Sequence, residues 1–372
     1  MIEDKLIEAG IDYCLIFLNR ELYNKNIHKK NIYLIEDFYS NYDKLLNFFK
    51  SILINISIFK KSLINDLHFL KKKKVERISF QILFLNSKFL FNALNNQSCV
   101  KNLITHKTKQ AIFFKAEGFE IKNLILSLKK EKIKTIAIQH GFVTESSKFS
   151  NLIVDEYWVW SKFFKDILQK QNNTLKIIIS GNPAYDNLFK ISKENKTEDN
   201  LNLIFLPNSG KSETTLENVK FSIEMCTKFF ANQSKYTLYI KPHPGGDNDL
   251  VKDIISKANS NYVKFIEKNK KINLCNYKII FTMNSTVGLE SSIFKKPLII
   301  LLSAKESLIV DEYIKENIAL LATDENQLKT AFTKVINEYK SFEKSCNNFK
   351  NKYLNFQGNS SNRIISLITS NV

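Results

Sequence analysis

The sharpest chemical signal in the sequence is Lys-Pro-His-Pro-Gly-Gly, at residues 241–246. Proline fixes the backbone φ angle, so two prolines around His243 make a rigid turn that holds the imidazole in one direction. A neighbouring lysine attracts anions, and a histidine can donate a hydrogen bond or a proton to a phosphate leaving group. A purely structural turn has no need of this pair. We therefore assign Lys241, His243 and Pro244 to a phosphate site.

A second polar run, Asn-Ser-Thr-Val-Gly-Leu-Glu at residues 284–290, follows one strand-like segment and opens a helix-like one. In a purely structural role, Ser285 and Thr286 would cap that helix. Capping explains one of these hydroxyls, but not both together with the small Gly288, so we favour a phosphate-binding role. About one turn into the helix, Glu290 can then reach the ribose hydroxyls of a nucleotide.

For two shorter runs, the sequence does not decide between a structural turn and a ligand-binding loop. Pro-Asn-Ser-Gly-Lys, at residues 207–211, is too short for a Walker A loop and matches no dinucleotide fingerprint. A turn and an anion-binding loop explain it equally well. The same choice stays open for Asp186, which closes Ser-Gly-Asn-Pro-Ala-Tyr-Asp at residues 180–186.

Candidate general bases end two strand-like segments near the middle of the chain. Glu117 stands in Ala-Glu-Gly, and His140 in Gln-His-Gly. A carboxylate or an imidazole at such a strand end can take the proton of an acceptor hydroxyl group. An acid just before a helix is also favoured by the helix dipole, which is the structural explanation for Glu117.

The elements that must position these groups follow a regular alternation, which is typical of βαβ units on parallel sheets. Strands are predicted at residues 110–115, 135–139, 156–160, 176–180, 201–206, 236–240, 262–266, 278–281 and 297–302. Helices are predicted at residues 120–131, 162–171, 213–231, 247–258, 287–294, 326–356 and 361–368. Before residue 100, short β-type runs at 13–18 and 31–35 alternate with a long amphipathic stretch at 42–74.

A polar stretch, Ser192–Asn200, interrupts this pattern and divides the chain. We expect an N-terminal acceptor-side domain at residues 1–190, a linker at 191–200 and a nucleotide-binding domain at 201–340. Helices at residues 341–372 would cross back to the first domain. Ligands bind at the carboxyl ends of parallel strands. All five prolines and seven of the nine glycines fall between residues 118 and 297, many of them at those strand ends, which predicts a cleft between the two domains.

Composition excludes several classes of protein. The formal net charge of +18 includes only three arginines, which is a poor supply for base readout in DNA, so no nucleic-acid partner is expected. Diffuse lysine charge attracts phosphate-bearing substrates or an anionic membrane face. The five cysteines form no Cys-x-x-Cys pair, which disfavours a disulfide framework or a zinc ribbon. With no secretory signal or long apolar run, a cytoplasmic protein is expected, working at the inner face of the membrane.

Taken in order, these motifs resemble bacterial glycosyltransferases of the GT-B type, which build capsules, lipopolysaccharide and teichoic acids. The resemblance covers residues 110–302. Lys-Pro-His-Pro with a later Ser/Thr pair is similar to the motifs of bacterial sialyltransferases and capsular Kdo transferases, which bind the CMP of the donor. Their acidic pair, which carries the base, is similar to Ala116-Glu117-Gly118, where only one acid is present.

The resemblance implies an α/β fold with two Rossmann-like domains facing a cleft. The leading hypothesis is a metal-independent glycosyltransferase without a cofactor, which moves a CMP-activated acidic sugar onto a capsule or lipopolysaccharide acceptor, glycan or lipid-linked. Glu117 would be the base, with His140 assisting or replacing it, and His243 would act at the leaving group. The residues assigned to the donor site are Asn208, Ser209, Gly210, Lys241, His243, Pro244, Asn284, Ser285, Thr286 and Glu290.

Three alternatives stay open. The order of motifs is also similar to CDP-glycerol glycerophosphotransferases, whose His-Gly-x-Pro-x-Lys run would correspond to residues 140–143; the proline and the lysine are missing here, and His140 would be the base. UDP-N-acetylglucosamine 2-epimerases share the two-domain plan but match the serine-rich run less well. A protein of another class, a non-catalytic binder of anionic surfaces, would need only the net charge.

Overall fold

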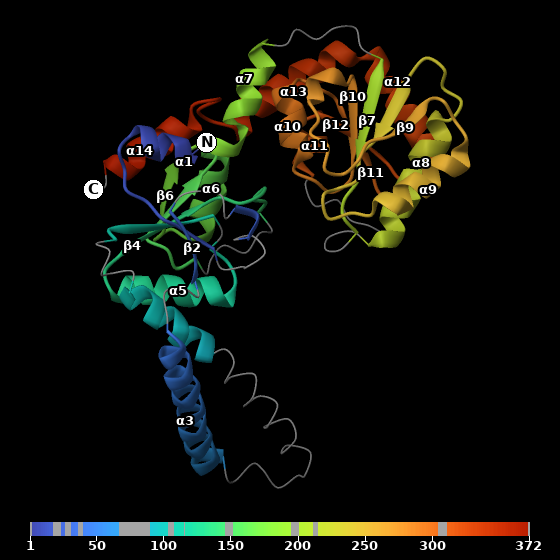
Figure 1. Ribbon diagram of the computed structural model, residues 1–372. Helices are drawn as coiled ribbons and strands as arrows, with labels where there is room; N and C mark the ends of the chain where they lie inside the picture. Colours follow the sequence, from blue (N-terminus) through green and yellow to red (C-terminus); the bar gives the residue numbers. More distant parts are fainter. Residues whose placement is uncertain are drawn as a thin grey trace.

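The computed structural model describes residues 2–17, 24–26, 31–35, 40–66, 90–102, 108–114, 116–145, 152–194, 201–210, 215–303 and 311–370. Within these residues the chain forms two α/β units with a helix, α7 (Asp186–Glu194), running between them (Figure 1). Across the described part of the chain, no helix has the length and apolar character of a membrane span. The expected α/β architecture is confirmed.

The first unit is built on a four-stranded parallel sheet in the order β3-β4-β5-β6. Its strands are β3 (Gln110–Phe113), β4 (Lys134–Ile138), β5 (Glu156–Val159) and β6 (Lys176–Ile179). Alternate residues face opposite sides, so the sheet needs apolar cover on both. On one side, Ala137 and Tyr157 pack with the helices α5 (Phe119–Lys130) and α6 (Lys162–Gln171) in the main core.

The C-terminal helix covers the other face of the first sheet. Helix α14 (Ser360–Thr369) places Ile364, Leu367 and Ile368 against Ile136 and Trp158 of the first sheet. The shorter elements of this unit are α1 (Ile2–Glu8), β1 (Leu15–Phe17), β2 (Ile32–Leu34), α3 (Asn41–Asp66) and the helical residues 90–102, with β1 and β2 forming a separate parallel pair. The first sheet is therefore complete only when the last helix is in place.

The second unit has a six-stranded parallel sheet in the order β12-β11-β10-β7-β8-β9. Its strands are β7 (Asn202–Leu206), β8 (Thr237–Ile240), β9 (Val263–Phe265), β10 (Ile279–Thr282), β11 (Leu298–Leu301) and β12 (Ala319–Ala322). Its helices are α8 (Leu216–Phe230), α9 (Asn248–Ala258), α10 (Val287–Ile293), α11 (Glu312–Lys315) and α12 (Glu325–Asn337). The chain runs outward from β7 to β9 and then returns to β10 on the other side, so the strand order reverses between β7 and β10.

Asp186 decides the open question about the Gly-Asn-Pro run. Its carboxylate accepts hydrogen bonds from the backbone N–H groups of Ser360 at 3.0 Å and Ser361 at 2.7 Å, which caps the start of α14. Gly181 has a φ angle of +75°, and a side chain there would collide with Ser360. This run is structural, because it fastens the C-terminal helix to the first unit.

Three element predictions need correction. Residues 191–194, the expected start of the linker, are the last turn of α7, since Ile191 packs against the core; residues 195–200 lie outside the described part. The helix expected over 326–356 breaks at Glu338, which separates α12 from α13 (Tyr339–Tyr353). The short elements α11 and β12 were not expected.

Candidate functional site

The reversal of strand order in the second sheet locates the candidate site. At such a switch point the loops after two neighbouring strands diverge and leave a crevice at their carboxyl ends. Asn208 follows β7 and Asn284 follows β10, and the Asn208 side-chain Nδ2 donates to the Asn284 carbonyl oxygen at 2.8 Å. This hydrogen bond joins two runs, 76 residues apart in the chain, that the sequence assigned to one donor site.

The Lys-Pro-His-Pro-Gly-Gly turn lies beside these two loops. It follows β8, the neighbour of β7, and the Lys241 N–H donates to the Phe205 carbonyl at 3.0 Å. A side chain built on Gly245 would come within 3.7 Å of Ser209 Cβ, so the turn and the Pro-Asn-Ser-Gly loop lie against one another. Three strand-end loops of the second unit therefore converge on one place.

Within the turn, the imidazole of His243 has a defined orientation. The Gly246 N–H donates to the His243 carbonyl at 2.7 Å, and the Gly245 N–H donates to His243 Nδ1 at 3.0 Å. Nδ1 is thus an acceptor, which places the proton of the neutral ring on Nε2. Partial burial and then the positive charge of Lys241 lower the pKa of His243 below its ordinary value. A neutral ring with its proton on Nε2 can donate a hydrogen bond to a phosphate oxygen.

Lys241 is held on the other side of the same turn. Its Nζ donates to the carbonyl oxygen of Lys268, after β9, at 2.8 Å, and burial lowers its pKa. One of the three ammonium protons is thereby used. Lys241 supplies positive charge next to His243 from a fixed position, rather than from a freely moving side chain.

The two hydroxyl groups of the Asn-Ser-Thr run differ in their hydrogen bonds. Ser285 Oγ accepts from the Val287 N–H at 3.3 Å, which accounts for this hydroxyl by local capping. Thr286 is the N-cap residue of α10 and its side chain makes no capping bond. Gly288 is explained by packing, because a side chain there would enter the ring of Tyr313. The small residue therefore serves the core, and the exposed Thr286 hydroxyl is the group that capping does not explain.

Glu290 lies deeper than expected, toward the junction of the two units. Burial raises its pKa, so this carboxyl holds its proton to higher pH than an ordinary glutamate. Its charge adds to the rise that burial causes in the pKa of Tyr185, of the first unit, and of Tyr313. Glu290 therefore lies near both tyrosines, in a part of the protein that is shielded from water.

On the first unit, the loop that carries His140 is held by its neighbour Gln139, whose side chain is 4% exposed. Gln139 Nε2 donates to the Gly141 carbonyl at 2.9 Å, and the Trp160 N–H donates to Gln139 Oε1 at 3.0 Å. The Trp160 indole N–H adds a bond of 3.1 Å to the Gln139 carbonyl. His140 itself is exposed at the carboxyl end of β4.

The same loop reaches the second unit through Phe142. Its ring centroid lies 5.9 Å from that of Tyr313 and 5.5 Å from that of Tyr353 in α13. Tyr313 in turn covers Gly288 in α10. A continuous line of aromatic contacts therefore connects the His140 loop to the helix that follows Ser285 and Thr286. The functional hypothesis did not include Gln139, Phe142 or Tyr313; the only signal for Gln139 in the sequence is that it precedes His140.

Glu117 is the less favoured of the two candidate bases. It follows β3, the edge strand, and is half-buried next to Tyr157, whose pKa is raised by burial and then by the Glu117 charge. Gly118, with a φ angle of +95°, turns the chain directly into α5. Both candidate bases thus stand at carboxyl ends of adjacent strands, and the His140 loop contacts the second unit through the aromatic line.

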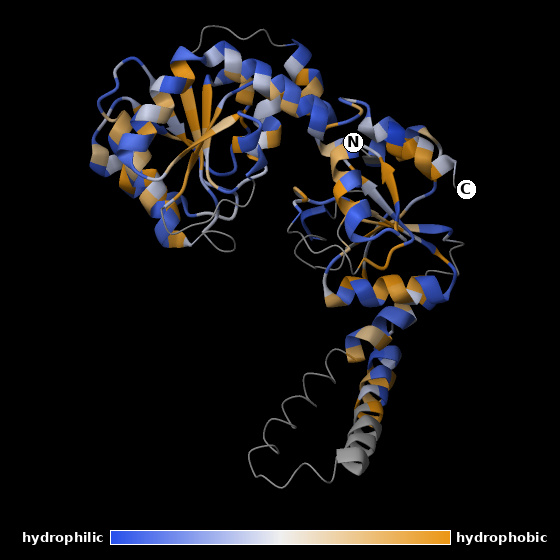
Figure 2. Cartoon of the chain, turned by 180° about the vertical axis from the view of Figure 1, so that it is seen from behind, coloured by the Kyte–Doolittle hydropathy of each residue, from blue (hydrophilic) through white to orange (hydrophobic). Residues whose placement is uncertain are grey.

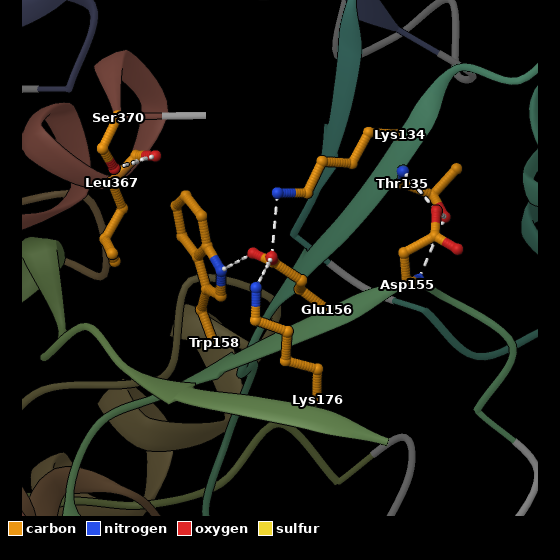
Figure 3. A network of polar contacts seen from close by, with 8 residues as sticks. All are labelled: Lys134, Thr135, Asp155, Glu156, Trp158, Lys176, Leu367 and Ser370. Carbon is orange, nitrogen blue, oxygen red and sulfur yellow. Dashed lines mark hydrogen bonds and ion pairs between the residues drawn. The ribbon is translucent and has the colours of Figure 1, made fainter. Parts of the chain in front are cut away.

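The strongest charged network of the first unit lies elsewhere. Glu156, 2% exposed, accepts from Lys134 at 2.8 Å, from Lys176 at 2.7 Å and from the Trp158 indole at 3.0 Å (Figure 3). Burial would raise the pKa of Glu156, but the two lysines outweigh it and hold the pKa below its ordinary value. Lys134, Glu156 and Lys176 each begin a strand, so the network lies at the amino ends of the strands, opposite the end that carries the candidate bases, and it stabilises the sheet.

Two carboxylates near the site have the spacing of a metal-binding pair, Asp247 and Asp249. Asp247 Oδ1, however, accepts from the N–H groups of Asp249 at 2.8 Å and Leu250 at 3.2 Å, as the N-cap of α9. In the part of the chain that the structure describes, no three His, Cys, Asp or Glu side chains gather in a group that could hold a metal ion.

The family model of CDP-glycerol:poly(glycerophosphate) glycerophosphotransferase matches residues 24–370. The chain belongs to this family. It is therefore a transferase, and the family supports the glycerophosphotransferase alternative better than the CMP-sugar hypothesis. The narrower resemblance to sialyl- and Kdo-transferases is not confirmed.

Solved structures similar to this member of the glycerophosphotransferase family confirm the GT-B fold. The UDP-GlcNAc 2-epimerase of Methanocaldococcus jannaschii is 15% identical, with 99% of this chain and 95% of that chain covered and a TM-score of 0.58. A glycosyltransferase from Rickettsia africae is 14% identical, with 100% and 93% covered and a TM-score of 0.54. The UDP complex of S. aureus MnaA is 15% identical, with 74% and 80% covered and a TM-score of 0.54. No curated protein matches the chain by sequence.

Proposed function

We propose that this protein transfers a polyol phosphate of the glycerophosphate class from a CDP-activated donor to a hydroxyl group of a bacterial surface polymer. The observation that carries the proposal is the family match over residues 24–370. The convergence of three strand-end loops at the β7/β10 switch point supports it, because that is where a nucleotide diphosphate fits in such a sheet.

In the proposed reaction, an acceptor hydroxyl oxygen attacks the phosphorus that carries the glycerol. A new P–O bond forms, the P–O bond to the CMP phosphate breaks, and CMP leaves with the bonding electron pair. His140, exposed at the end of β4, takes the hydroxyl proton. The choice of His140 over Glu117 is supported by the rigid hold of Gln139 on its loop and by the contact of that loop with the second unit.

The donor phosphates would lie against the second unit. His243 Nε2–H, the Lys241 ammonium and the Thr286 hydroxyl point to an anion as the ligand, and the loop at residues 208–210 closes the crevice. The hydrogen bonds of Ser285 and Asn284 support this assignment, because they fix the loop at residues 284–286 beside residue 208. In this proposal the nucleotide extends to the region of Tyr185 and Tyr313, where Glu290 contacts the ribose.

The CMP-sugar hypothesis uses the same phosphate site, so only the donor separates the two. Thermal unfolding with CDP-glycerol, a CMP-sugar, CMP, CDP, UDP and GDP tests the proposal. We expect CDP-glycerol, CDP and CMP to raise the melting temperature, with release of CMP when CDP-glycerol meets an acceptor. CMP release from a CMP-sugar alone would favour the sugar-transfer hypothesis. No stabilisation by any nucleotide, with all anion binding lost by about 0.5 M salt, would favour a non-catalytic surface binder.

For the acceptor, we propose a glycan or lipid-linked polymer at the inner face of a membrane. Net charge supports this, since +18 favours a polyanionic polymer or an anionic surface.

A further inference from the structure

The connection between β9 and β10 leaves a cavity on the second sheet. Both faces of a parallel sheet need cover, and a crossover between parallel strands usually carries a helix that supplies it. Residues 266–278, all within the described part of the chain, pass from the edge strand β9 to β10 and form a single turn of 3-10 helix, Leu274–Asn276. A cavity of about 410 Å³ lies between this connection and the sheet. Pockets that hold small ligands have volumes of about 300–1,000 Å³.

The floor of this cavity is polar, although the strands of the second sheet are largely hydrophobic (Figure 2). Lys264 of β9 is paired in register with Tyr239 of β8. The two side chains therefore share one side of the sheet, opposite to the buried Val263 and Leu238. Lys264 Nζ lies 5.8 Å from the centre of the Tyr239 ring. A lysine is thus held over an aromatic ring at the base of the cavity.

The connection itself supplies the opposing wall. Lys270 and Lys271 line the cavity from the loop after β9, and Tyr277 lines it just before β10. The Tyr277 ring meets the Tyr239 ring edge to face, with the two centroids 5.8 Å apart. Burial, and then Tyr239, raise the pKa of Tyr277, so its hydroxyl group stays protonated at neutral pH. The cavity therefore has two aromatic rings beside its lysines.

The charge of the cavity indicates the kind of ligand that it takes. Among the described residues that line it, none is acidic and three are lysines. One acid, Glu267, stands close to these lysines in the sequence, but its carboxylate is engaged by α9, where it accepts from Lys252 at 2.8 Å and from Asn248 at 2.6 Å. Like charges around one cavity repel one another, and a bound anion relieves this repulsion. The lysines suit a phosphate group, and the two rings suit the carbon skeleton that carries it.

This cavity is separate from the donor site but shares a loop with it. None of the described residues assigned to the donor site lines the cavity. Lys268 joins the loop to the Lys-Pro-His-Pro-Gly-Gly turn: its carbonyl accepts from Lys241 Nζ at 2.8 Å, and its own Nζ donates to the Gly246 carbonyl at 3.2 Å. Lys270 follows two positions later, and two residues of chain span at most about 7 Å, so the two sites are neighbours.

We propose that the cavity is a second binding site, which takes a phosphate ester of a sugar or polyol. Lys264, Lys270 and Lys271 hold the phosphate, while Tyr239 and Tyr277 pack against the carbon skeleton. The ester is either a free small molecule or one unit of a phosphate-bearing polymer. This site goes beyond the proposed transfer reaction and does not depend on the identity of the donor.

Isothermal titration calorimetry of the full chain, with sn-glycerol 3-phosphate as the probe, tests this site. Lys264→Gln with Lys270→Gln should weaken binding at least about tenfold, because charge-assisted contacts to the phosphate are lost. Lys340→Gln with Lys344→Gln, at exposed positions of α13, removes the same charge elsewhere and should bind the ester as the unchanged protein does. Unchanged thermal unfolding shows that both double variants are folded. Inorganic phosphate should bind the unchanged protein at least about fivefold more weakly than the ester, because it has no carbon skeleton to pack on the rings.

Three results would overturn the proposal. Undiminished binding by the Lys264/Lys270 variant would show that the ester does not bind in the cavity, and its loss in His243→Ala instead would place it in the donor site. An equal loss in both double variants, or equal binding of inorganic phosphate and the ester, would show attraction by charge alone. A short oligo(glycerophosphate) distinguishes the two sources: tighter binding than the single ester identifies a unit of a polymer as the ligand, and equal binding identifies a free ester.

Discussion

The side-chain amide of Asn208 donates a 2.8 Å hydrogen bond to the main-chain carbonyl of Asn284, across the point where the strand order of the second sheet reverses. Each residue follows its own strand, and the bond joins two loops that lie 76 residues apart in the chain. In the proposed function this bond sets the width of the phosphate crevice.

Asn208→Asp removes the amide donor and puts a carboxylate beside both a carbonyl oxygen and the donor phosphates. Loss of a partly buried hydrogen bond that leaves its partner unsatisfied costs about 1–3 kcal/mol, so we expect kcat/KM for the donor to fall by about tenfold to a hundredfold, mainly through KM. Steady-state kinetics measure this. Asn326→Asp, on the exposed side of α12, is the control. A normal KM in the Asn208 variant would show that the bond does not shape the donor site.

Gln139 is expected to act as a positioning residue for His140. Gln139→Glu keeps the size of the side chain but removes the N–H that donates to the Gly141 carbonyl. We expect kcat to fall about tenfold or more with little change in the donor KM, because the phosphate site is on the other unit. If the donor KM rose while kcat stayed normal, the His140 loop would belong to donor binding instead.

Glu290→Gln should change the pH dependence of stability. Burial raises the Glu290 pKa above its ordinary value of 4.5, so the folded protein holds this proton more tightly than the unfolded chain. Its stabilising contribution is complete below that value and is lost as pH rises through the folded-state pKa. The glutamine variant should therefore melt higher than the unchanged protein at neutral pH, with the difference fading toward pH 4.5. Melting curves across this range check it; a constant difference would contradict burial as the cause.

Asp186→Ala should act on stability and not on catalysis. Loss of a helix cap costs about 0.5–2 kcal/mol, and here it also loosens α14 from the first sheet. Denaturant unfolding should report a loss of about that size, while nucleotide affinity stays within about twofold. A large loss of nucleotide affinity with unchanged stability would reopen a ligand role for Asp186.

Local pattern predicted most of the fold. Strands such as β4 and β10 are short apolar runs bounded by polar residues, and the helices between them have clear apolar periodicity, so their positions follow from neighbouring residues. The sequence predicted a single helix over α12 and α13, because the apolar spacing continues through Glu338. The structure divides it into two helices at that residue. The four-residue elements α11 and β12 are too short to show a period.

Features of the candidate site that depend on neighbouring residues were predictable from the sequence. Features that depend on contacts between residues far apart in the chain were not. His243 is a candidate because of the two prolines around it, and in the structure the N–H of the neighbouring Gly245 orients its ring. The role of Gly288 was misread, because its reason is Tyr313, 25 positions later in the sequence. Likewise, Gln139 is informative only once Trp160 is known to lie on the next strand.

The most direct measurement of the central claim is product formation from CDP-glycerol, followed by phosphorus NMR, with the unchanged protein and the variants His140→Ala and Glu117→Ala. We expect a new phosphodiester and CMP from the unchanged protein. The His140 variant should lose about a hundredfold to ten-thousandfold in turnover while still being stabilised by CDP-glycerol, and the Glu117 variant should remain active. An active His140 variant beside an inactive Glu117 variant, or transfer from a CMP-sugar with none from CDP-glycerol, would contradict the account.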